Sequence, residues 1–389
     1  MSTMKAEVKE AYAKAAVEGI NLCSTDSYAG LDLSWIPDEV LAVNQGCGSP
    51  LTDIEGGLRR GERVVDLGCG ASLDVFLAAR QVGAGGHVFG VDMTPQMLDI
   101  ARRASEKVAD HLGYANVTLR EAVMEELPIE SASIDTVISN CVINLSEDKR
   151  RVFSEIFRVL RPGGRFVIAD VLAMNELPNY IRNDELLVSK CLGGALSIES
   201  FAAAVRETGF RGFSPLVQKS YGKVDNYELL SLTVTGYKPD PSRGQGLRFA
   251  TLLGPCSSVV DELGNRFARG VCTEISEATA AVLQLPRYRE YFFLSPTQRQ
   301  IKGSAALGVA PEPGPCVYTG DFVNLVGPFT EVRDDDHHVF AVGRESEVCG
   351  KTMKVLATPL YKQLFAMLNR CQGEISARQV VCGPGTGCC

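Results

Sequence analysis

The chain contains no apolar run that approaches the roughly 18 to 20 residues needed to cross a bilayer, and its N-terminus lacks a basic stretch followed by an apolar one. Basic residues are outnumbered, with 39 Lys and Arg against 47 Asp and Glu and a net charge of -8. Because phosphate binding requires clustered Lys and Arg, this balance argues against a nucleic-acid partner. We therefore expect a cytoplasmic protein that binds neither membranes nor nucleic acid.

Histidine is scarce as well, with only 4 in 389 residues, and no Cys-x2-Cys pair of the kind that binds zinc occurs. Cysteine itself is abundant: there are 13, an odd number that cannot all pair within one chain. With 45% apolar and 22% charged residues, the chain is long enough for two or three ordinary globular domains. Reduced cysteines with a ligand or redox role are therefore the feature to follow.

Strand-like and helix-like segments alternate through the first 170 residues. One amphipathic helix, from Met4 to about Gly19, comes first. The expected strands are then 63–67, 87–91, 117–121, 136–139 and 165–170, and the expected helices between them are 73–81, 95–112 and 149–159. This alternation predicts a parallel, doubly wound α/β sheet with helices on both faces.

The polar segment 238–246 is rich in Pro and Gly and is the expected domain boundary. Beyond it the sequence repeats without a gap, because Gly254-Pro255 recurs as Gly327-Pro328, 73 positions later (327 - 254 = 73). We interpret residues 247–370 as a smaller α+β domain built from an internal duplication, with repeat units at about 252–294 and 325–367. The remaining residues, 371–389, are expected to form a flexible, Cys-rich tail.

A glycine turn follows the first expected strand of the sheet. Residues 64–67 lead into Gly68-Cys69-Gly70, where backbone amides can closely approach a polar or anionic group. The next strand ends at Asp92, roughly 20 positions downstream, where a carboxylate can accept both ribose hydroxyls of a nucleoside cofactor. This spacing fits a dinucleotide as well as S-adenosylmethionine. Asp66 before the turn, and the segment 121–128 after the third strand, favour S-adenosylmethionine.

Three longer motifs resemble one family, the arsenite S-adenosylmethionine methyltransferases within the class I methyltransferases. They are VGAGGHVFGVDMTPQML at 82–98, ISNCVINLS at 138–146 and CLGGAL at 191–196. The resemblance covers about residues 10 to 240. It implies a Rossmann-like methyltransferase and metalloid-binding region at 61–238, capped at the active site by the helix and cysteine-bearing loops of residues 1–60.

The resemblance also implies how the cofactor is bound. Asn140, in the second motif, would hold the methionine amine through its backbone. Tyr12, an aromatic residue of the first helix, would close over the cofactor. The implied cofactor-binding residues are Tyr12, Asp66, Gly68, Gly70, Asp92, Met93, Met124, Glu125 and Asn140. Of these, Met124 and Glu125 would face the adenine. One departure is Ser72, which stands where the family usually has a further glycine.

Trivalent arsenic is soft and thiophilic, and three thiolates can bind it as a pyramid whose lone pair remains available to attack an electrophilic methyl group. Such chemistry needs cysteines that are held close together and close to the cofactor. Cys141 follows a strand expected beside the glycine turn, while Cys47 and Cys191 lie near glycines that let the backbone bend around an ion. We predict these three as the catalytic ligands of arsenic. For each one alone, a buried and inert thiol is the alternative.

Other cysteines are possible accessory ligands. Cys23 resembles an N-terminal cysteine of the family that forms a disulfide or transiently accepts the metalloid. The chain ends in Cys388-Cys389, and because vicinal cysteines rarely form a relaxed disulfide, capture of metalloid from solution is the more natural function. The alternative is that these thiols are dispensable.

The resemblance implies methyl transfer from S-adenosylmethionine to arsenite and methylarsenite, for arsenic detoxification. It also implies an external thiol reductant, glutathione or thioredoxin. We take a monomer as the working expectation. Two alternatives stay open: a class I methyltransferase that acts on another small molecule, and a binding protein that sequesters a metalloid without chemistry.

Overall fold

A computed structural model describes residues 3–18, 28, 30–44, 46, 48–54, 56–184, 187–188, 191–299, 318–334, 338–342, 344–358, 361 and 364–367. Four predicted site residues lie outside the described residues, namely Cys23, Cys47, Cys388 and Cys389. The predicted tail at 371–389 lies outside them too.

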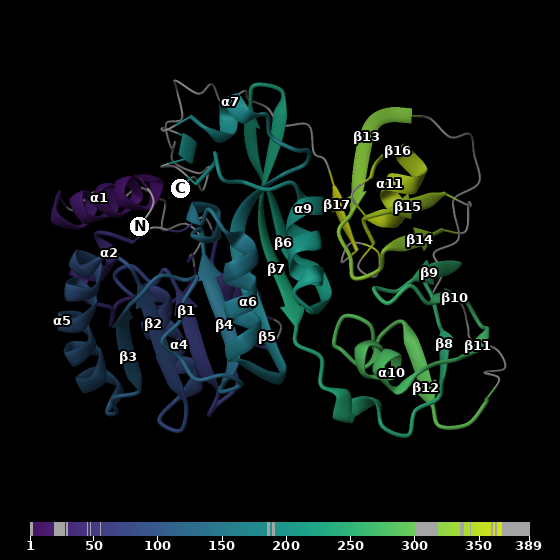
Figure 1. Cartoon of the computed structure of the whole chain (residues 1–389), viewed down its shortest axis with the longest axis horizontal. Coiled ribbons are helices and arrows are strands. Elements are labelled where there is room, and N and C mark those ends of the chain that lie inside the picture. The colour runs from purple at the N-terminus through teal and green to yellow at the C-terminus, as the bar shows by residue number, and fades with distance from the viewer. Residues whose placement is uncertain are drawn as a thin grey trace. The chain divides into compact units, whose positions relative to one another are not determined.

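A 7-stranded sheet forms the centre of the first part of the chain, in the order β3-β2-β1-β4-β5-β7-β6 (Figure 1). Neighbouring strands from β3 to β5 are parallel, as predicted. Val64 and Val65 of β1 are fully buried, which is typical of a strand covered on both faces. The strands are β1 (Arg63–Leu67), β2 (His87–Asp92), β3 (Val117–Glu121), β4 (Ile134–Asn140), β5 (Leu160–Ala173), β6 (Arg211–Val224) and β7 (Tyr227–Tyr237).

Helices connect the parallel strands. α5 (Pro95–Leu112) has proline in its first turn, where no amide partner is lost, and ends at Gly113, whose φ is 78°. The connection from β1 to β2 runs along the sheet in one direction and that from β4 to β5 in the other. Right-handed crossovers therefore place α4 (Leu73–Val82) and α6 (Lys149–Val159) on opposite faces. The other helices here are α1 (Thr3–Glu18), α2 (Asp38–Leu41), α3 (Pro50–Asp53), η2 (Ile143–Leu145), α7 (Asn179–Arg182) and α9 (Ile198–Glu207).

The carboxyl ends of β1, β2 and β4 meet at one edge of the sheet because these strands are parallel. Leu67, Asp92 and Asn140 are their last residues. Helix α1 lies over this edge (Figure 1), and its Val8 and Tyr12 line the same pocket as the residues that follow the strands. Doubly wound sheets bind their ligands at this edge.

One order of elements occurs twice in the C-terminal part. Helix α11 begins 73 positions after α10 (350 - 277 = 73), which is the offset of the sequence repeat. Where β9 and β14 pair, Val259 lies opposite Val332, its own counterpart at that offset. That the halves arose by duplication stays an interpretation. The elements are η3 (Pro241–Gly244), then β8 (Phe249–Leu252), β9 (Ser258–Val260), β10 (Arg266–Ala268), β11 (Cys272–Glu274), α10 (Glu277–Leu283) and β12 (Phe292–Ser295), followed by β13 (Tyr318–Leu325), β14 (Glu331–Arg333), β15 (Val339–Ala341), β16 (Glu345–Cys349), α11 (Gly350–Leu356) and β17 (Phe365–Met367).

Two compact units divide the described residues. The first comprises residues up to 197 together with 216–234, and the second comprises 198–215 together with 235–370. The second unit thus takes in a segment that the sequence assigned to the sheet domain. One contact that joins this segment to the rest of the second unit is a hydrogen bond of 2.6 Å, which the Gly212 amide donates to the Glu262 carboxylate.

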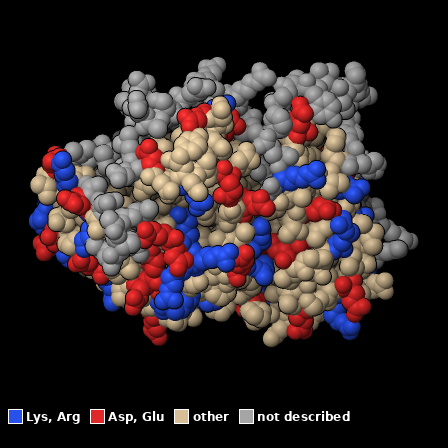
Figure 2. Space-filling model, turned by 45° about the horizontal axis from the view of Figure 1, so that its top comes forward, with Lys and Arg blue, Asp and Glu red and all other residues tan. Residues whose placement is uncertain are grey.

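No described helix is long and apolar enough to cross a membrane. Basic and acidic side chains are interspersed on the face seen in Figure 2.

Candidate active site

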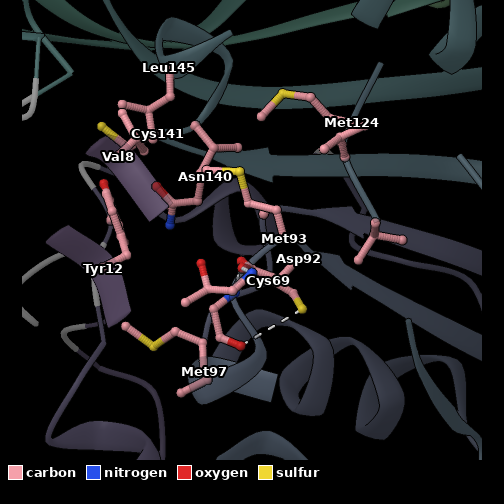
Figure 3. Close-up of a pocket in the computed structure, with 18 of the residues that line it drawn as sticks. Val8, Tyr12, Cys69, Asp92, Met93, Met97, Met124, Asn140, Cys141 and Leu145 are labelled. Carbon is pink, nitrogen blue, oxygen red and sulfur yellow. Dashed lines mark hydrogen bonds between the residues drawn. The ribbon is translucent and has the colours of Figure 1, made fainter. Parts of the chain in front are cut away.

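A pocket opens at the carboxyl edge of the sheet, and the space in it and at its mouth is about 930 Å³ (Figure 3). Helix α1 and the residues that follow β1, β2 and β4 form its walls. The predicted site residues that line it are Tyr12, Gly68, Gly70, Asp92, Met93, Met124, Glu125, Asn140, Cys141 and Cys191.

Hydrogen bonds join the glycine turn to Asp92. The Gly70 amide donates to Asp92 Oδ2 over 2.9 Å, and the Thr94 amide donates to Oδ1 over 2.8 Å. Gly68 and Gly70 have φ angles of 65° and 50°, and a Cβ on Gly68 would come within 2.6 Å of Val142, so both positions favour glycine. Asp92 is thereby fixed at the pocket wall, where its carboxylate can accept ribose hydroxyls.

Two carboxyl groups are buried beside the glycine turn. Asp66 and Asp74 are 3% and 6% exposed, and Tyr28 Oη donates to Asp74 Oδ2 over 2.9 Å. Burial raises the pKa of Asp74 to about 6. Burial, together with the charges of Asp74 and Asp92, also raises the pKa of Asp66. A bound cation would offset this concentration of negative charge, so the residues fit S-adenosylmethionine, which carries a sulfonium and an ammonium group.

The side chain of Asn140 lies against Gly46 and holds Gly48 by two hydrogen bonds. Its Oδ1 accepts the Gly48 amide over 3.2 Å, and its Nδ2 donates to the Gly48 oxygen over 2.8 Å. The same Nδ2 lies 3.0 Å from Tyr28 Oη and 3.2 Å from Asp74 Oδ2, and donates to both. A Cβ on Gly46 would come within 2.5 Å of the Asn140 amide. Asn140 therefore links the buried Asp74 carboxyl group to Gly46 and Gly48. Only glycine at position 46 leaves room for this close approach.

Cys141 and Cys191 come together in the same pocket. Cys191 Sγ donates to the Cys141 backbone oxygen over 3.1 Å, and Tyr12 Oη lies 3.8 Å from Cys191 Sγ. Both cysteines are buried, and their backbones adopt the left-handed conformation, with φ angles of 61° and 62°. Residues other than glycine rarely occupy this region outside functional sites. Cys141 is disulfide-bonded, whereas Cys191 retains its thiol. Two of the three predicted ligands are thus brought together, and Cys47 lies outside the described residues.

Comparison with known proteins places the first part of the chain in a family. A methyltransferase-domain model matches residues 58–224. The arsenite methyltransferase of Mus musculus is 31% identical and aligns with 71% of this chain and 77% of its own length. The chain belongs to the arsenite methyltransferase family.

Microbial members of the arsenite methyltransferase family are more similar over shorter stretches. The Halobacterium salinarum protein is 37% identical over 52% of this chain and 56% of its own length, and that of Aquipseudomonas alcaligenes is 41% identical over 46% and 51%. The chain thus spans about half the length of these two relatives. A crystal structure of the arsenic(III) S-adenosylmethionine methyltransferase from Chlamydomonas reinhardtii matches with a TM-score of 0.52 and 31% identity, covering 73% of this chain and 95% of that one. A separate family model, a domain of unknown function, matches residues 250–309 and 312–386.

Cys69 and Ser72 lie in and directly after the glycine turn. Ser72 adopts a φ of 75°, a conformation that favours the glycine expected there from the resemblance. Its hydroxyl donates to Cys69 Sγ over 3.4 Å. Burial raises the pKa of the Cys69 thiol well above its usual range, and the charge of Asp92 adds to this. Cys69 therefore favours the protonated thiol, which is not the form that binds arsenic.

Sequence reasoning missed several residues in and beside the candidate site. Tyr28 and Asp74 contact Asn140, but they stand in no recognisable motif. Ser146, the last residue of the second motif, donates to the Glu125 carboxylate over 2.6 Å at the predicted adenine end. Its place in the motif is the one signal that could have identified it.

Proposed function

We propose that this protein transfers the methyl group of S-adenosylmethionine to trivalent arsenic bound by the thiolates of Cys47, Cys141 and Cys191. The observation that carries the proposal is the 3.1 Å contact between the Cys191 thiol and the Cys141 backbone, in the pocket whose wall contains Asp92. A cofactor-binding carboxylate and two cysteines far apart in sequence thus share one cavity. The relatives named arsenite methyltransferases support arsenite as the substrate.

The pocket residues would act by binding and positioning. Asp92 would accept the ribose hydroxyls, and the buried carboxyls Asp66 and Asp74 would stabilise the cationic end of the cofactor. S-adenosylmethionine supplies a methyl group on a sulfonium, so that a C–As bond forms as the C–S bond breaks and its electron pair stays on sulfur. The arsenic lone pair carries no proton, and the step therefore needs no general base.

Cys141 is disulfide-bonded, and a disulfide offers no thiolate to arsenic. Three thiolate ligands therefore require a two-electron reduction of this disulfide by an external thiol, for which glutathione and thioredoxin are suitable chemical classes. Methyl transfer formally oxidises arsenic from the trivalent to the pentavalent state. The same reductant class, by forming a disulfide from two thiols, would return it to the trivalent state for another transfer.

The test uses the purified, reduced chain with methyl-labelled S-adenosylmethionine and arsenite. We expect labelled methylarsenicals, detected by liquid chromatography, and their loss in Cys141→Ser and Cys191→Ser. Normal turnover in both variants would remove the thiolate site and leave a methyltransferase for another acceptor. Stoichiometric arsenite binding by wild type without any labelled product would instead support a sequestering protein.

A further inference from the structure

A buried hydrogen-bond network joins the segment that carries Cys141 to the one that carries Cys191. At its centre is Asn144, three residues after Cys141 and 4% exposed. Its Nδ2 donates to the Cys191 backbone oxygen over 3.0 Å and to the Val171 oxygen over 2.7 Å. One side chain thus connects the turn after β4, the end of β5 and residue 191.

Asp170 sets the orientation of this amide. Asp170 is 1% exposed; its Oδ1 accepts Asn144 Nδ2 over 2.8 Å and its Oδ2 accepts the Asn144 backbone amide over 3.2 Å. The Val171 amide also donates to Oδ1, over 2.8 Å. A carboxylate that accepts both the side chain and the backbone of one residue leaves that residue a single orientation.

Gly194 makes room for the network. A Cβ on Gly194 would come within 1.9 Å of the Asn144 backbone oxygen, so any other residue at position 194 would push the two segments apart. The left-handed φ belongs to Cys191 itself, which means that its backbone is held in an unfavourable conformation by the surrounding contacts. The hydrogen bond from Asn144 to the Cys191 oxygen is one of those contacts.

We propose that Asn144, oriented by Asp170, is the positioning residue that fixes Cys191 relative to Cys141. Glycine at position 194 leaves the space that this arrangement needs. The inference rests on the proposed function, because it assigns the spacing of the thiolates that would chelate arsenic. Asn144 acts through the Cys191 backbone, whose oxygen accepts its Nδ2. Its effect therefore falls on arsenic binding, while Asp92 and the glycine turn are left intact.

The test compares Asn144→Ala with Asn116→Ala in the full reduced chain. Asn116 is the matched control because it is also buried and its Nδ2 also donates to two backbone oxygens, those of Ala79 and Gly83, away from the pocket. We expect Asn144→Ala to raise KM for arsenite about tenfold or more, because the Cys191 oxygen loses the hydrogen bond that fixes its segment. KM for S-adenosylmethionine should stay unchanged, and Asn116→Ala should leave both KM values unchanged even where it lowers thermal stability.

A second measurement does not depend on arsenic chemistry. Dibromobimane alkylates two neighbouring thiols, each of which displaces one bromide, and peptide mass spectrometry identifies the residues that it joins. We expect a Cys141–Cys191 cross-link in reduced wild type and less of it in Asn144→Ala. Should wild type fail to methylate arsenite, the proposed function falls while this measurement still tests the positioning role. Equal cross-linking and equal KM for arsenite in Asn144→Ala would overturn the inference.

Gly194→Ala covers the case in which Asn144→Ala does not fold, as judged by loss of S-adenosylhomocysteine binding. Its control is Gly85→Ala, since a Cβ there would meet nothing within 4 Å. We expect the Cys141–Cys191 cross-link to be lost and KM for arsenite to rise in Gly194→Ala. Gly85→Ala should behave like wild type in both measurements. Wild-type behaviour of Gly194→Ala in both measurements would contradict it.

Discussion

The thiol of Cys191 donates a hydrogen bond to the backbone oxygen of Cys141, a residue 50 positions earlier in the chain. Both residues are held in the left-handed region, where a side chain costs conformational energy. The two strained backbones lower the stability of the folded state, yet they bring two cysteines together in the pocket that contains Asp92. This relationship would link the proposed arsenic site to the proposed cofactor site, and the predictions below test that link.

Serine replaces a soft sulfur ligand by a hard oxygen at nearly the same volume. We expect Cys141→Ser and Cys191→Ser each to lower kcat/KM for arsenite by about 100-fold or more, because chelation geometry is lost. Cofactor affinity should not change, since both substitutions leave Asp92 and its hydrogen bond to the Gly70 amide in place. The measurement is the initial rate at varied arsenite, with Cys272→Ser, a partly exposed thiol of the second unit, as the matched control. Wild-type kinetics in either site variant would argue against its role as a ligand.

The loop around position 47 depends on close approach to Asn140. A Cβ on Gly46 would lie within 2.5 Å of Asn140 Nδ2, so Gly46→Ala must displace either the loop or the amide. A displacement of this kind is expected to reduce methyl transfer to arsenite by about 10- to 100-fold. Steady-state rates of Gly46→Ala and of the open-space control Gly85→Ala provide the comparison. Equal rates would mean that the contact does not position the loop.

Asp92 is expected to contribute to cofactor affinity through its charge. Hydrogen bonds to a charged acceptor are worth about 1.5–3 kcal/mol, so Asp92→Asn should weaken S-adenosylhomocysteine binding by about 10- to 100-fold. Calorimetric titration measures this directly. Asp99→Asn is the control, because Asp99 is an exposed carboxylate on α5 that pairs with Arg102. Unchanged affinity of Asp92→Asn would remove Asp92 from the cofactor site.

Asp170 makes the stability of the first unit depend on pH. Burial raises the pKa of Asp170 to about 7, whereas aspartate in an unfolded chain titrates near pH 4. The stabilising contribution of its protonated form is therefore complete below about pH 4 and is lost as the pH rises through 7. We expect the unfolding free energy of wild type to fall relative to that of Asp170→Asn across this interval, with a constant difference at higher pH.

Tryptophan fluorescence during urea unfolding measures this effect. The chain has 1 tryptophan, Trp35, which lies in the first unit and stacks on His111, so its signal reports that unit. Curves for wild type and Asp170→Asn that stay parallel from pH 4 to 7 would show that Asp170 titrates normally.

The parallel part of the central sheet could be predicted because short strand-like segments rich in apolar residues alternate with segments of helical periodicity, and the first strand is followed directly by Gly68. The spacing from Gly70 to Asp92 identified the cofactor edge for the same reason: both lie at the ends of neighbouring parallel strands. The grouping of residues 198–215 with the second unit could not be predicted. It depends on contacts such as that of Gly212 with Glu262, which leave no periodic pattern.

The glycines near the cysteines were expected to let the backbone bend around an ion, and that stays a prediction. The structure adds a second constraint at Gly46 and Gly194, where other atoms lie so close that a Cβ would not fit. Cys141 and Cys191 themselves adopt the left-handed φ. Close approach between segments far apart in sequence cannot be read from spacing, and the roles of the Asn140 and Asn144 side chains were missed for that reason.

The most direct test of the thiolate site is arsenic K-edge X-ray absorption of the reduced full chain loaded with one equivalent of arsenite. The account predicts three sulfur neighbours around arsenic in wild type and two in Cys141→Ser and in Cys191→Ser. Oxygen neighbours in place of sulfur, or an unchanged count of three sulfurs in both variants, would contradict it.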